Sequence, residues 1–362
     1  MGTAMTNKAR DRALQHYLEE ALYYYDLPGL QAALEMDGYY WSGAAGFRSV
    51  ETREALRTDH VFHMASVAKL FTSTAVLLLA EDGRLSPEDR LVDLLPWIGI
   101  DDPRRGEIRL QNLLTHTAGI GDVDDYHWQQ PRFDEEALRE YCRSPEVAAS
   151  HLKWSPGENK FSYSNIAYEI LGCLVAEVSG MPFETFIEQR ILRPLGMERT
   201  SFLTFRRPAS ELACPHFKDR SKHMQLLPYY PYNREHGPSS TLTSTVSDMR
   251  IWAQAHLRHR LLPARAYEKI WHAHTTVPNN GEGMGLGWFL REQNGYRLMG
   301  HEGSDDGFRS SFWLCPQRHG FIAVMANLSG APVKRINRQL FDRFCAMEDG
   351  GAAGENGGRT DC

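Results

Sequence analysis

Residues 63–71 read HMASVAKLF, and an apolar run, AVLLLA at 75–80, follows them. This composition predicts a buried helix over 66–82 that carries Ser66 and Lys69 one turn apart. Helical residues three positions apart lie on one face, about 5–6 Å from each other, so the lysine amine can reach the serine hydroxyl. A hydroxyl becomes a nucleophile when a base takes its proton, and burial makes a lysine easier to deprotonate. The stretch therefore predicts a serine that forms an acyl-enzyme.

The spacing alone is a weak indicator, because the chain contains a second Ser-x-x-Lys at Ser150 and Lys153. That copy runs into the turn signal WSPG at 154–157, so no apolar helix follows it. The alternative for Ser66 is a helix N-cap followed by an ordinary surface lysine. The surrounding sequence has to decide between these two interpretations.

The composition is that of a folded globular protein with a sizeable core. Of the 362 residues, 42% are hydrophobic and 24% are charged, and the length allows two domains or one large interrupted domain. The formal net charge is −6 and the basic residues are scattered, which argues against a nucleic-acid-binding surface. We therefore expect a small-molecule substrate and no nucleic-acid partner.

The chain has the features of a cytoplasmic protein without a membrane anchor. Residues 1–10 lead into a charged amphipathic helix, with no apolar segment before a small-residue cleavage site. The longest apolar run is well short of the roughly 20 residues that a membrane-spanning helix needs. The six cysteines are widely spaced, which fits free thiols in a reducing compartment. We expect a soluble, cytoplasmic protein.

Strand patterns near both ends and helix patterns between them define the expected architecture. An antiparallel sheet is expected from residues 1–62 plus 275–347, with a mainly helical region inserted at 63–274. The Gly-rich tail 348–362 is expected to be disordered. Asp37-Gly38 is a strong hairpin signal between the first two strands. The predicted helices are 10–25, 66–82, 107–115, 134–142, 165–179, 183–192, 246–258 and 333–346, and the predicted strands are 30–36, 39–45, 287–292, 296–300, 309–314 and 321–327.

Three further motifs accompany the serine–lysine pair. They are Tyr163-Ser164-Asn165, Gly285-Leu286-Gly287-Trp288 and Gly300-His301-Glu302-Gly303, the last on a predicted strand edge. One known family contains all of these motifs, and other stretches of the chain match that family in the same order, including LLTHTAG at 113–119, PLGM at 194–197 and STVSDM at 244–249. Over roughly residues 20–345 the chain resembles the serine β-lactamase-related hydrolases. That family includes DD-peptidases of the penicillin-binding-protein kind, class C-type β-lactamases, family VIII carboxylesterases and acyltransferases of the same fold.

The resemblance implies a fold, and it implies a role for each polar side chain of these motifs. The fold would be the α/β fold of β-lactamases and penicillin-binding proteins, an antiparallel sheet flanked by helices. Ser66 would be the nucleophile, and Lys69 and Tyr163 would be the coupled groups that move its proton. Asn165 would hydrogen-bond Lys69 and a substrate carbonyl. Without Ser66 and Lys69 in the chain, Tyr163 would be interpreted as a core aromatic residue at a helix N-terminus.

The last motif departs from the β-lactamases, which carry Lys-Thr-Gly or a close variant where this chain has His301-Glu302-Gly303. The resemblance places His301 and Gly303 at the substrate, and it makes the backbone N–H groups of Ser304 and Ser66 the oxyanion hole. Histidine is mostly neutral at pH 7, and Glu302 adds a negative charge beside it, so anionic substrates should fit less well. Family VIII esterases, D-aminopeptidase-type hydrolases and related acyltransferases have a histidine-containing variant here.

Two loops are candidates for the walls of the pocket. The loop 122–131 contains Tyr126 and Trp128, and a proline-rich loop contains Tyr230 and Tyr232. Long aromatic loops over a scaffold commonly form binding walls; the alternative is that they pack as surface loops on the helical region. Their aromatic content favours an apolar or aromatic acyl or leaving group.

No cofactor and no metal are expected. Four histidines in the second half of the chain lack the spacing of a zinc site, and they are His256, His259, His272 and His274. His116 is expected to be a buried, hydrogen-bonded histidine at a helix end.

The sequence thus predicts a serine hydrolase that acts through an acyl-Ser66 intermediate, with a small or medium carboxylic ester as the favoured substrate. Esters are favoured because an alkoxide is a good leaving group and an esterase needs no carboxylate anchor. An amidase or D-aminopeptidase and an acyltransferase would use the same residues. A catalytically silent binding or sensor protein is the alternative from another class, and the complete set of site residues argues against it. The oligomeric state is left open.

Overall fold

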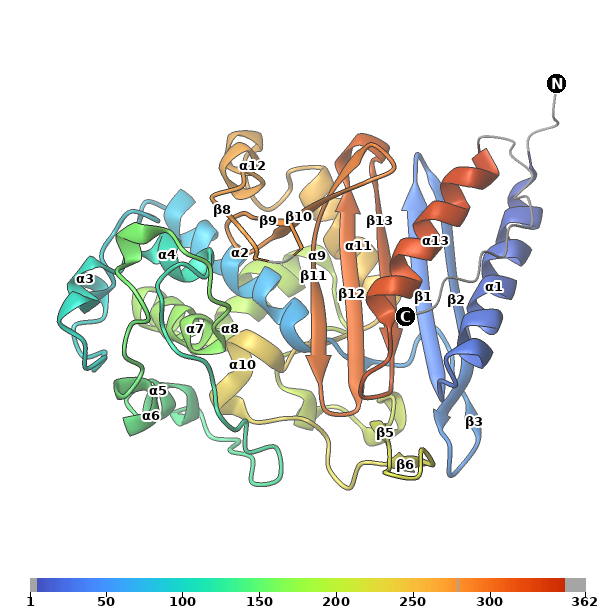
Figure 1. Ribbon diagram of the computed structural model, residues 1–362, viewed down its shortest axis with the longest axis horizontal. Coiled ribbons are helices and arrows are strands. Elements are labelled where there is room, and N and C mark those ends of the chain that lie inside the picture. Colours follow the sequence, from blue (N-terminus) through green and yellow to red (C-terminus); the bar gives the residue numbers. More distant parts are fainter. Residues whose placement is uncertain (1–4, 279, 349–362) are drawn as a thin grey trace.

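A computed structural model describes residues 5–278 and 280–348, so most of the expected disordered tail lies outside the described residues. Its central element is a nine-stranded antiparallel sheet in the order β3-β2-β1-β13-β12-β11-β10-β9-β8 (Figure 1). The strands are β1 Gly29–Met36, β2 Tyr39–Ser49, β3 Glu54–Ala55, β8 Thr275–Thr276, β9 Gly283–Met284, β10 Phe289–Gln293, β11 Tyr296–Asp305, β12 Phe308–Cys315 and β13 Gly320–Ala326. The N-terminal strand β1 pairs with the C-terminal strand β13, for example Leu30 with Ala326. The predicted antiparallel sheet built from both ends of the chain is therefore confirmed.

Helices cover the two faces of this sheet. The terminal helices α1 (Asn7–Tyr24) and α13 (Val333–Glu348) pack on one face and contact each other. Side chains alternate along β1, so Leu30, Ala32 and Leu34 join the core beneath these helices, whereas Ala33 faces the opposite core. Helix α11 (Val246–Leu257) packs on β1 and β13. The sheet is thus buried on both sides.

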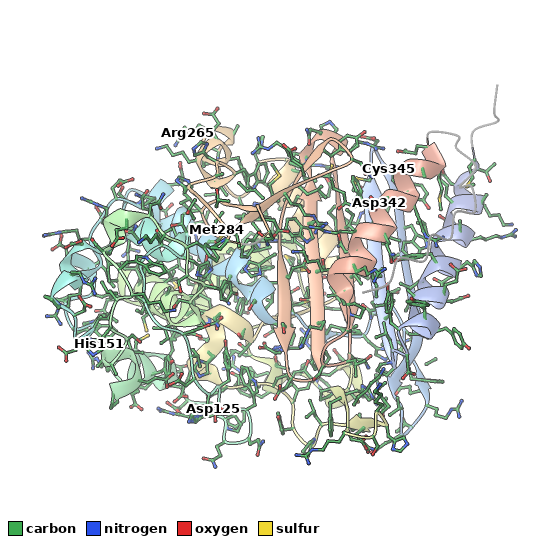
Figure 2. All side chains as sticks on the ribbon, in the orientation of Figure 1. Asp125, His151, Arg265, Met284, Asp342 and Cys345 are labelled. Atoms are coloured by element: carbon green, nitrogen blue, oxygen red, sulfur yellow. The ribbon has the colours of Figure 1, made fainter. Side chains whose placement is uncertain are left out.

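The remaining helices form a region beside the sheet, at the left in Figure 1. They are α2 Ala68–Glu81, α3 Leu91–Leu94, α4 Leu110–Leu114, α5 Ala137–Cys142, α6 Pro145–Ala148, α7 Asn165–Ser179, α8 Phe183–Ile187, α9 Arg193–Leu195, α10 Gly237–Ser240 and α12 Ala264–Ile270. Two small sheets pair β4 (Phe62–His63) with β7 (Thr243–Ser244), and β5 (His216–Lys218) with β6 (Met224–Leu226). Side chains fill the space between this region and the sheet (Figure 2).

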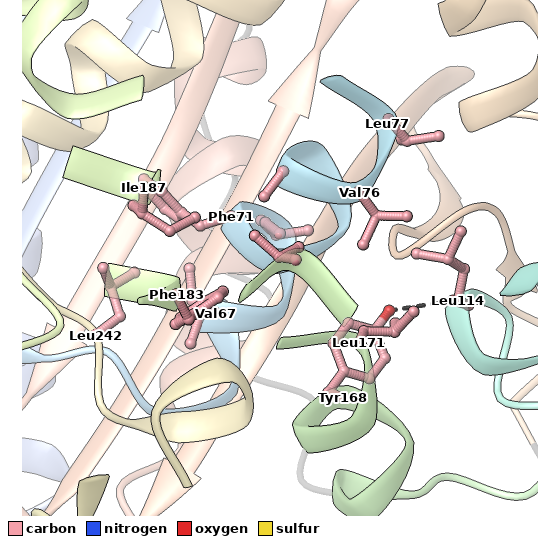
Figure 3. Close-up of a cluster of buried hydrophobic side chains, with 14 of the residues drawn as sticks. Val67, Phe71, Val76, Leu77, Leu114, Tyr168, Leu171, Phe183, Ile187 and Leu242 are labelled. Carbon is pink, nitrogen blue, oxygen red and sulfur yellow. Dashed lines mark hydrogen bonds between the residues drawn. The ribbon is translucent and has the colours of Figure 1, made fainter. Parts of the chain in front are cut away.

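Helix α2 lies in the middle of the larger hydrophobic core, because nearly every one of its side chains is buried. Phe71 stacks on Trp252 of α11 with ring centroids 3.8 Å apart. On its other side α2 packs against α7, where Tyr168 donates a hydrogen bond to the Leu114 carbonyl over 3.1 Å (Figure 3). This enclosure fixes the N-terminal end of α2, which carries the serine–lysine pair.

Strand β11 extends further than the sequence predicted. The predicted strand ended at Gly300, whereas the observed strand continues to Asp305, which pairs with Phe308 of β12. Asp306-Gly307 forms the connecting turn, and Gly307 has a φ of 77°, a conformation that glycine adopts easily. The hairpin places the whole His301-Glu302-Gly303 motif inside a strand.

No single helix of the described residues is long and apolar enough to cross a membrane. The pair formed by Asn165–Ser179 and Phe183–Leu195 passes by length and composition, but the two helices are bent by 74°. Most side chains of the first helix are buried in the core.

Candidate active site

Ser66 lies in the 3-10 turn η1 (Ala65–Val67), directly before α2. Ala65 has a φ of 47°, a left-handed conformation that costs energy for a residue with a Cβ. Its neighbours Ala65 and Val67 are fully buried, whereas Ser66 is half-buried. Ser66 lines a cavity of about 430 Å³. The serine hydroxyl is therefore presented to the cavity from a rigidly packed turn.

Lys69 is fully buried one turn after Ser66. Its Nζ donates hydrogen bonds to Ser66 Oγ over 3.0 Å, to Asn165 Oδ1 over 2.6 Å and to the Ser239 carbonyl over 2.9 Å. A lysine ammonium has three N–H donors, so all three are used. The structure thus brings the two residues of the Ser66–Lys69 pair together as the spacing predicted.

Burial lowers the pKa of Lys69 from 10.5 to about 8, because the charged form loses its hydration. The carboxylates of Glu169, Asp305 and Asp122 oppose this change. A lysine with this pKa exchanges its proton near neutral pH, which suits a base for the serine hydroxyl.

The second Ser-x-x-Lys has a different environment. The Ser150 hydroxyl donates to the Glu146 carbonyl, and the exposed Lys153 donates to Ser162 Oγ over 2.8 Å. Identical spacing therefore gives a buried, catalytic-type pair only where an apolar helix encloses the lysine.

Tyr163 and Asn165 are positioned by the start of α7. Ser164 is the N-cap of this helix, and its Oγ accepts a hydrogen bond from the Ala167 N–H over 3.1 Å. Asn165 is then the first helical residue, and Tyr163 precedes the cap. The Lys69 Nζ lies 5.0 Å from the centroid of the Tyr163 ring.

Burial raises the pKa of Tyr163 well above 10, and a hydrogen bond with Ser66 acts in the opposite direction. The resting tyrosine is therefore a neutral phenol beside the serine hydroxyl. The structure brings Ser66, Lys69, Tyr163 and Asn165 together, although Lys69 and Asn165 are 96 positions apart in the chain.

Asp122 is a site residue that the sequence did not single out. Its Oδ1 accepts hydrogen bonds from the Asn165 backbone N–H over 2.7 Å and from Asn165 Nδ2 over 2.9 Å. This contact leaves the amide oxygen of Asn165 directed at Lys69. The only signal in the sequence is its place at the start of an aromatic loop, which does not identify a contact with α7.

His116 is buried, as predicted, and it packs against the ring of Tyr163 at a centroid distance of 4.4 Å. Its Nδ1 accepts a hydrogen bond from the Ser164 N–H over 3.2 Å. Burial lowers the pKa of His116 well below 6.5, so the ring is neutral. Among the described residues no partner of its Nε2 is found, so only half of its hydrogen-bonding capacity is used. His116 supports Tyr163 from behind.

Strand β11 forms the opposite wall of the site. His301 and Ser304 line the cavity with Ser66, and Ser304 is exposed. Gly303 packs against the turn before the serine: a Cβ on this residue would lie 2.2 Å from the Met64 carbonyl oxygen. The backbone next to Ser66 and the backbone of β11 are therefore in contact, which is the arrangement that an oxyanion hole of two backbone N–H groups needs.

His301 is almost fully buried, and its Nδ1 lies 2.6 Å from the Glu302 carbonyl oxygen. Burial lowers the pKa of His301 to about 3, and the charge of Lys69 adds to this effect. Since a carbonyl only accepts, Nδ1 carries the proton and Nε2 is an acceptor without a partner among the described residues. His301 is thus a neutral group in this strand.

The sequence analysis expected Glu302 to add a negative charge beside His301, but in the structure this charge has partners of its own. Its carboxylate accepts a hydrogen bond from Trp313 Nε1 over 2.7 Å and lies 3.7 Å from the Arg291 guanidinium. Glu302 lines the same cavity as His301, and Arg291 balances its charge there. Burial raises the pKa of Glu302, and Arg291 opposes this change.

A buried histidine–carboxylate contact links the two walls of the site. His63, on β4, has its Nε2 at 2.8 Å from Asp305 Oδ2, at the end of β11. The side chains are 0% and 6% exposed. This contact holds the segment before Ser66 against the same strand that carries Ser304.

The four aromatic residues expected in the pocket wall have different positions. Tyr126 lines the cavity, and Trp128 stacks on its ring with centroids 4.7 Å apart. Tyr232 stacks instead on Phe133, and Tyr230 packs against Phe308. Trp128, Tyr230 and Tyr232 are not among the residues that line the cavity, so they support the loops rather than form the wall.

Residues of β10 and β12, and of the loops before α7 and β9, complete the wall. Phe161, Phe289 and Trp313 give it an aromatic surface, and none of them was predicted as a pocket residue. Figure 2 shows Asp125, the neighbour of Tyr126, at the edge of the molecule.

Within residues 5–278 and 280–348 no group of three or more His, Cys, Asp or Glu side chains could hold a metal ion.

Comparisons with known proteins agree with this geometry. The family model described as Beta-lactamase matches residues 11–343. Protein flp of Staphylococcus aureus (strain N315) is 25% identical over 348 residues, which cover 93% of this chain and 67% of that protein.

Solved structures share the fold. The octameric penicillin-binding protein homologue from Pyrococcus abyssi has a TM-score of 0.81 at 24% identity, over 92% of this chain and 77% of that chain. A D-stereospecific amidohydrolase from Streptomyces sp. has a TM-score of 0.76 at 24% identity, over 94% of this chain and 99% of that chain. The family match over most of the sequence, together with this fold, shows that the chain belongs to the Beta-lactamase family of serine hydrolases.

Proposed function

We propose that the protein is a serine hydrolase that forms an acyl-Ser66 intermediate and acts on small or medium carboxylic esters. The observation that carries this proposal is the buried Lys69 Nζ, 3.0 Å from Ser66 Oγ, in a site that is open to a cavity. A binding protein would have no need to keep a lysine fully buried beside a cavity serine.

The proposed reaction uses the groups that surround Ser66 in the resting site. Lys69 and Tyr163 act as a coupled pair that takes the Ser66 proton while Oγ attacks the substrate carbonyl. The backbone N–H groups of Ser66 and Ser304 stabilise the oxyanion, and the tyrosine passes the proton to the leaving alkoxide. Water then attacks the acyl group, and the same residues act in reverse.

The charges around the cavity support a substrate without a carboxylate. His301 is neutral, and among the described lining residues the cation is Lys334, which pairs with Glu282 over 2.8 Å. Carboxylates of Asp122 and Asp305 lie near the reacting groups. A negatively charged substrate would lose hydration without gaining a free cation. The aromatic wall favours an apolar acyl or leaving group.

Amide hydrolysis is the second candidate. The fold neighbour named D-stereospecific amidohydrolase supports it, and so does the exposed carboxylate of Asp122 beside the site, which would attract a substrate with a free amino group. Amides leave as amines, so the proton supplied by Tyr163 would matter more for this substrate class than for esters.

Hydrolysis of p-nitrophenyl acetate and butyrate by the purified protein tests the ester proposal. Ser66→Ala is the control, and we expect it to lose at least about a thousandfold in kcat/KM. The intact mass should show one acyl group on the wild-type protein and none on the variant. Equal turnover by both proteins would refute the role of Ser66, and cleavage of amino-acid amides but not of esters would favour the amidase.

A further inference from the structure

A cluster of buried polar residues contacts Lys69 and is not part of the cavity lining. Glu169 of α7, His236 directly before α10, and Ser239 within α10 are all fully buried. Glu169 Oε1 accepts a hydrogen bond from Ser239 Oγ over 2.6 Å, and it lies 3.3 Å from His236 Nδ1. A carboxylate on a helix that is otherwise apolar here costs hydration, so its place in the core asks for a compensating partner.

Ser239 connects this cluster directly to the catalytic lysine. Its backbone carbonyl accepts a hydrogen bond from Lys69 Nζ over 2.9 Å, while its side chain donates to Glu169. Asn165 and Glu169 lie one turn apart on α7, so the same helix face holds the lysine through Asn165 and faces the cluster through Glu169. The bonds run from Glu169 through one serine to the lysine.

We propose that Glu169 is a positioning residue for the acylation site: its carboxylate, held by His236 and Ser239, keeps the Lys69 ammonium charged and directed at Ser66 in the resting enzyme. This inference rests on the proposed function only for its catalytic consequence. The effect of Glu169 on the charge of Lys69 can be measured without any substrate.

The groups that face Lys69 come from several elements. Asp305 on β11 is paired with His63, Asp122 is hydrogen-bonded to Asn165, and His301 is neutral. Among the carboxylates that raise the pKa of Lys69, Glu169 has the largest effect. Of these three carboxylates it is also the one that is fully buried, where charges are screened least.

The surroundings of Glu169 are compatible with a carboxylate. Burial raises the pKa of Glu169 above its ordinary value, and the hydrogen bonds with His236 and Ser239 and the charge of Lys69 oppose this change. Its other titratable neighbours are Tyr141 and Cys142. Burial is the main cause that raises both pKa values, with the charge of Glu169 next for Tyr141 and the contact with Cys173 next for Cys142, so both remain neutral. Tyr126 packs on the His236 ring at 4.8 Å and is neutral for the same reason.

Glu169→Gln tests the proposal because it removes the charge and keeps the size of the side chain. The pKa of Lys69 is measured by NMR from the Cε signals of labelled lysine, with Lys69 assigned by the loss of its signal in Lys69→Arg. We expect the substitution to lower this pKa by roughly one pH unit, since an opposite charge nearby has been removed. The acidic limb of kcat/KM for p-nitrophenyl acetate should move to lower pH by the same amount.

Glu184→Gln is the matched control. Glu184 is another buried carboxylate, and it pairs with Arg234, just before the His236 segment, over 2.9 Å. This control should leave the pKa of Lys69 unchanged, because no contact joins Glu184 to the lysine. Equal effects of both variants would overturn the proposal, since general loosening of the core would then explain them.

Two further outcomes separate the inference from the proposed function. An unchanged or higher pKa of Lys69 in Glu169→Gln overturns the inference, whether or not the protein is active. A lowered pKa in a protein that never acylates supports the inference and refutes the hydrolase. If Glu169→Gln does not fold, Ser239→Ala keeps the carbonyl that holds Lys69 and removes one bond to Glu169, and it should lower the pKa of Lys69 by a smaller amount.

Discussion

Gly303 on β11 lies against the Met64 carbonyl, two residues before Ser66. A Cβ at this position would lie 2.2 Å from the Met64 oxygen and 2.2 Å from Ser310 Oγ, which itself donates to the same carbonyl over 2.6 Å. Backbone and a short side chain cannot move aside as the end of a flexible side chain can. The absence of a side chain at this glycine therefore lets the strand approach the serine turn.

Gly303→Ala should separate β11 from the turn that presents Ser66. We expect the free energy of unfolding, measured with urea, to fall by about 1–3 kcal/mol. Ester turnover should fall by more than the loss of folded protein would explain. Gly99→Ala is the control, because nothing lies within 4 Å of a Cβ built on Gly99. Wild-type kinetics in Gly303→Ala would mean that the contact does not shape the site.

Lys69→Met should leave a folded protein with little activity. The substitution removes the buried amine that we propose as the base, and we expect kcat/KM to fall by about 100- to 10,000-fold. Lys153→Met provides a control from the second Ser-x-x-Lys, since its lysine is exposed and hydrogen-bonds Ser162. Comparable losses in the two variants would show that the observed geometry does not identify the base.

Turnover of a neutral ester should rise with pH through about 8. Burial lowers the pKa of Lys69 to about 8, and the lysine must lose its proton before it can act as a base. Below this pH the ammonium form predominates and activity falls; above it activity levels off. The measurement is the pH profile of kcat/KM, corrected for spontaneous hydrolysis. A flat profile across this range would contradict the assignment of Lys69.

Asp122→Ala should disturb the site through Asn165. The carboxylate holds both the backbone N–H and the side-chain amide of Asn165, so its loss frees the amide to rotate away from Lys69. We expect kcat to fall by roughly ten- to a hundredfold with little change in the melting temperature. Asp124→Ala, in the same exposed loop, should behave like the wild type; if it does not, loop mobility rather than Asn165 is the cause.

His301→Lys should change the preference between neutral and anionic esters. Burial keeps His301 uncharged, whereas a lysine there would place a cation at the cavity. We expect the ratio of kcat/KM for a carboxylate-bearing ester to that for p-nitrophenyl acetate to rise about tenfold. His301→Gln, which has no charge, should leave the ratio near its original value. The same rise in both variants would attribute the change to space instead of charge.

Local patterns in the sequence were sufficient for much of the fold. The apolar run after Ser66 predicted a buried helix, and the observed α2 begins at Ala68, directly after the serine turn. Strand patterns at both ends of the chain predicted the antiparallel sheet. Both depend on which residues within one element are apolar, and that information is contained in a short stretch of sequence.

Other features depended on partners that are distant in the chain. Asp122 and Glu169 gave no local signal, because each acts through a contact that the fold creates, with Asn165 and with Ser239. Tyr230 and Tyr232 were candidates for the pocket wall on composition alone, with packing on the scaffold as the alternative, and they pack on other aromatic rings. A side chain's residue type states what it can bind but not which surface it faces.

The sequence by itself determined the residue types of the site and the spacing of Ser66 and Lys69, since one helical turn fixes that distance. Only the tertiary structure decided how far the pKa of Lys69 falls and that Arg291 balances the charge of Glu302. The physical reason is that charge state depends on hydration and on neighbouring charges. Both are set by packing between α2, α7, α10 and β11, which lie far apart in the chain.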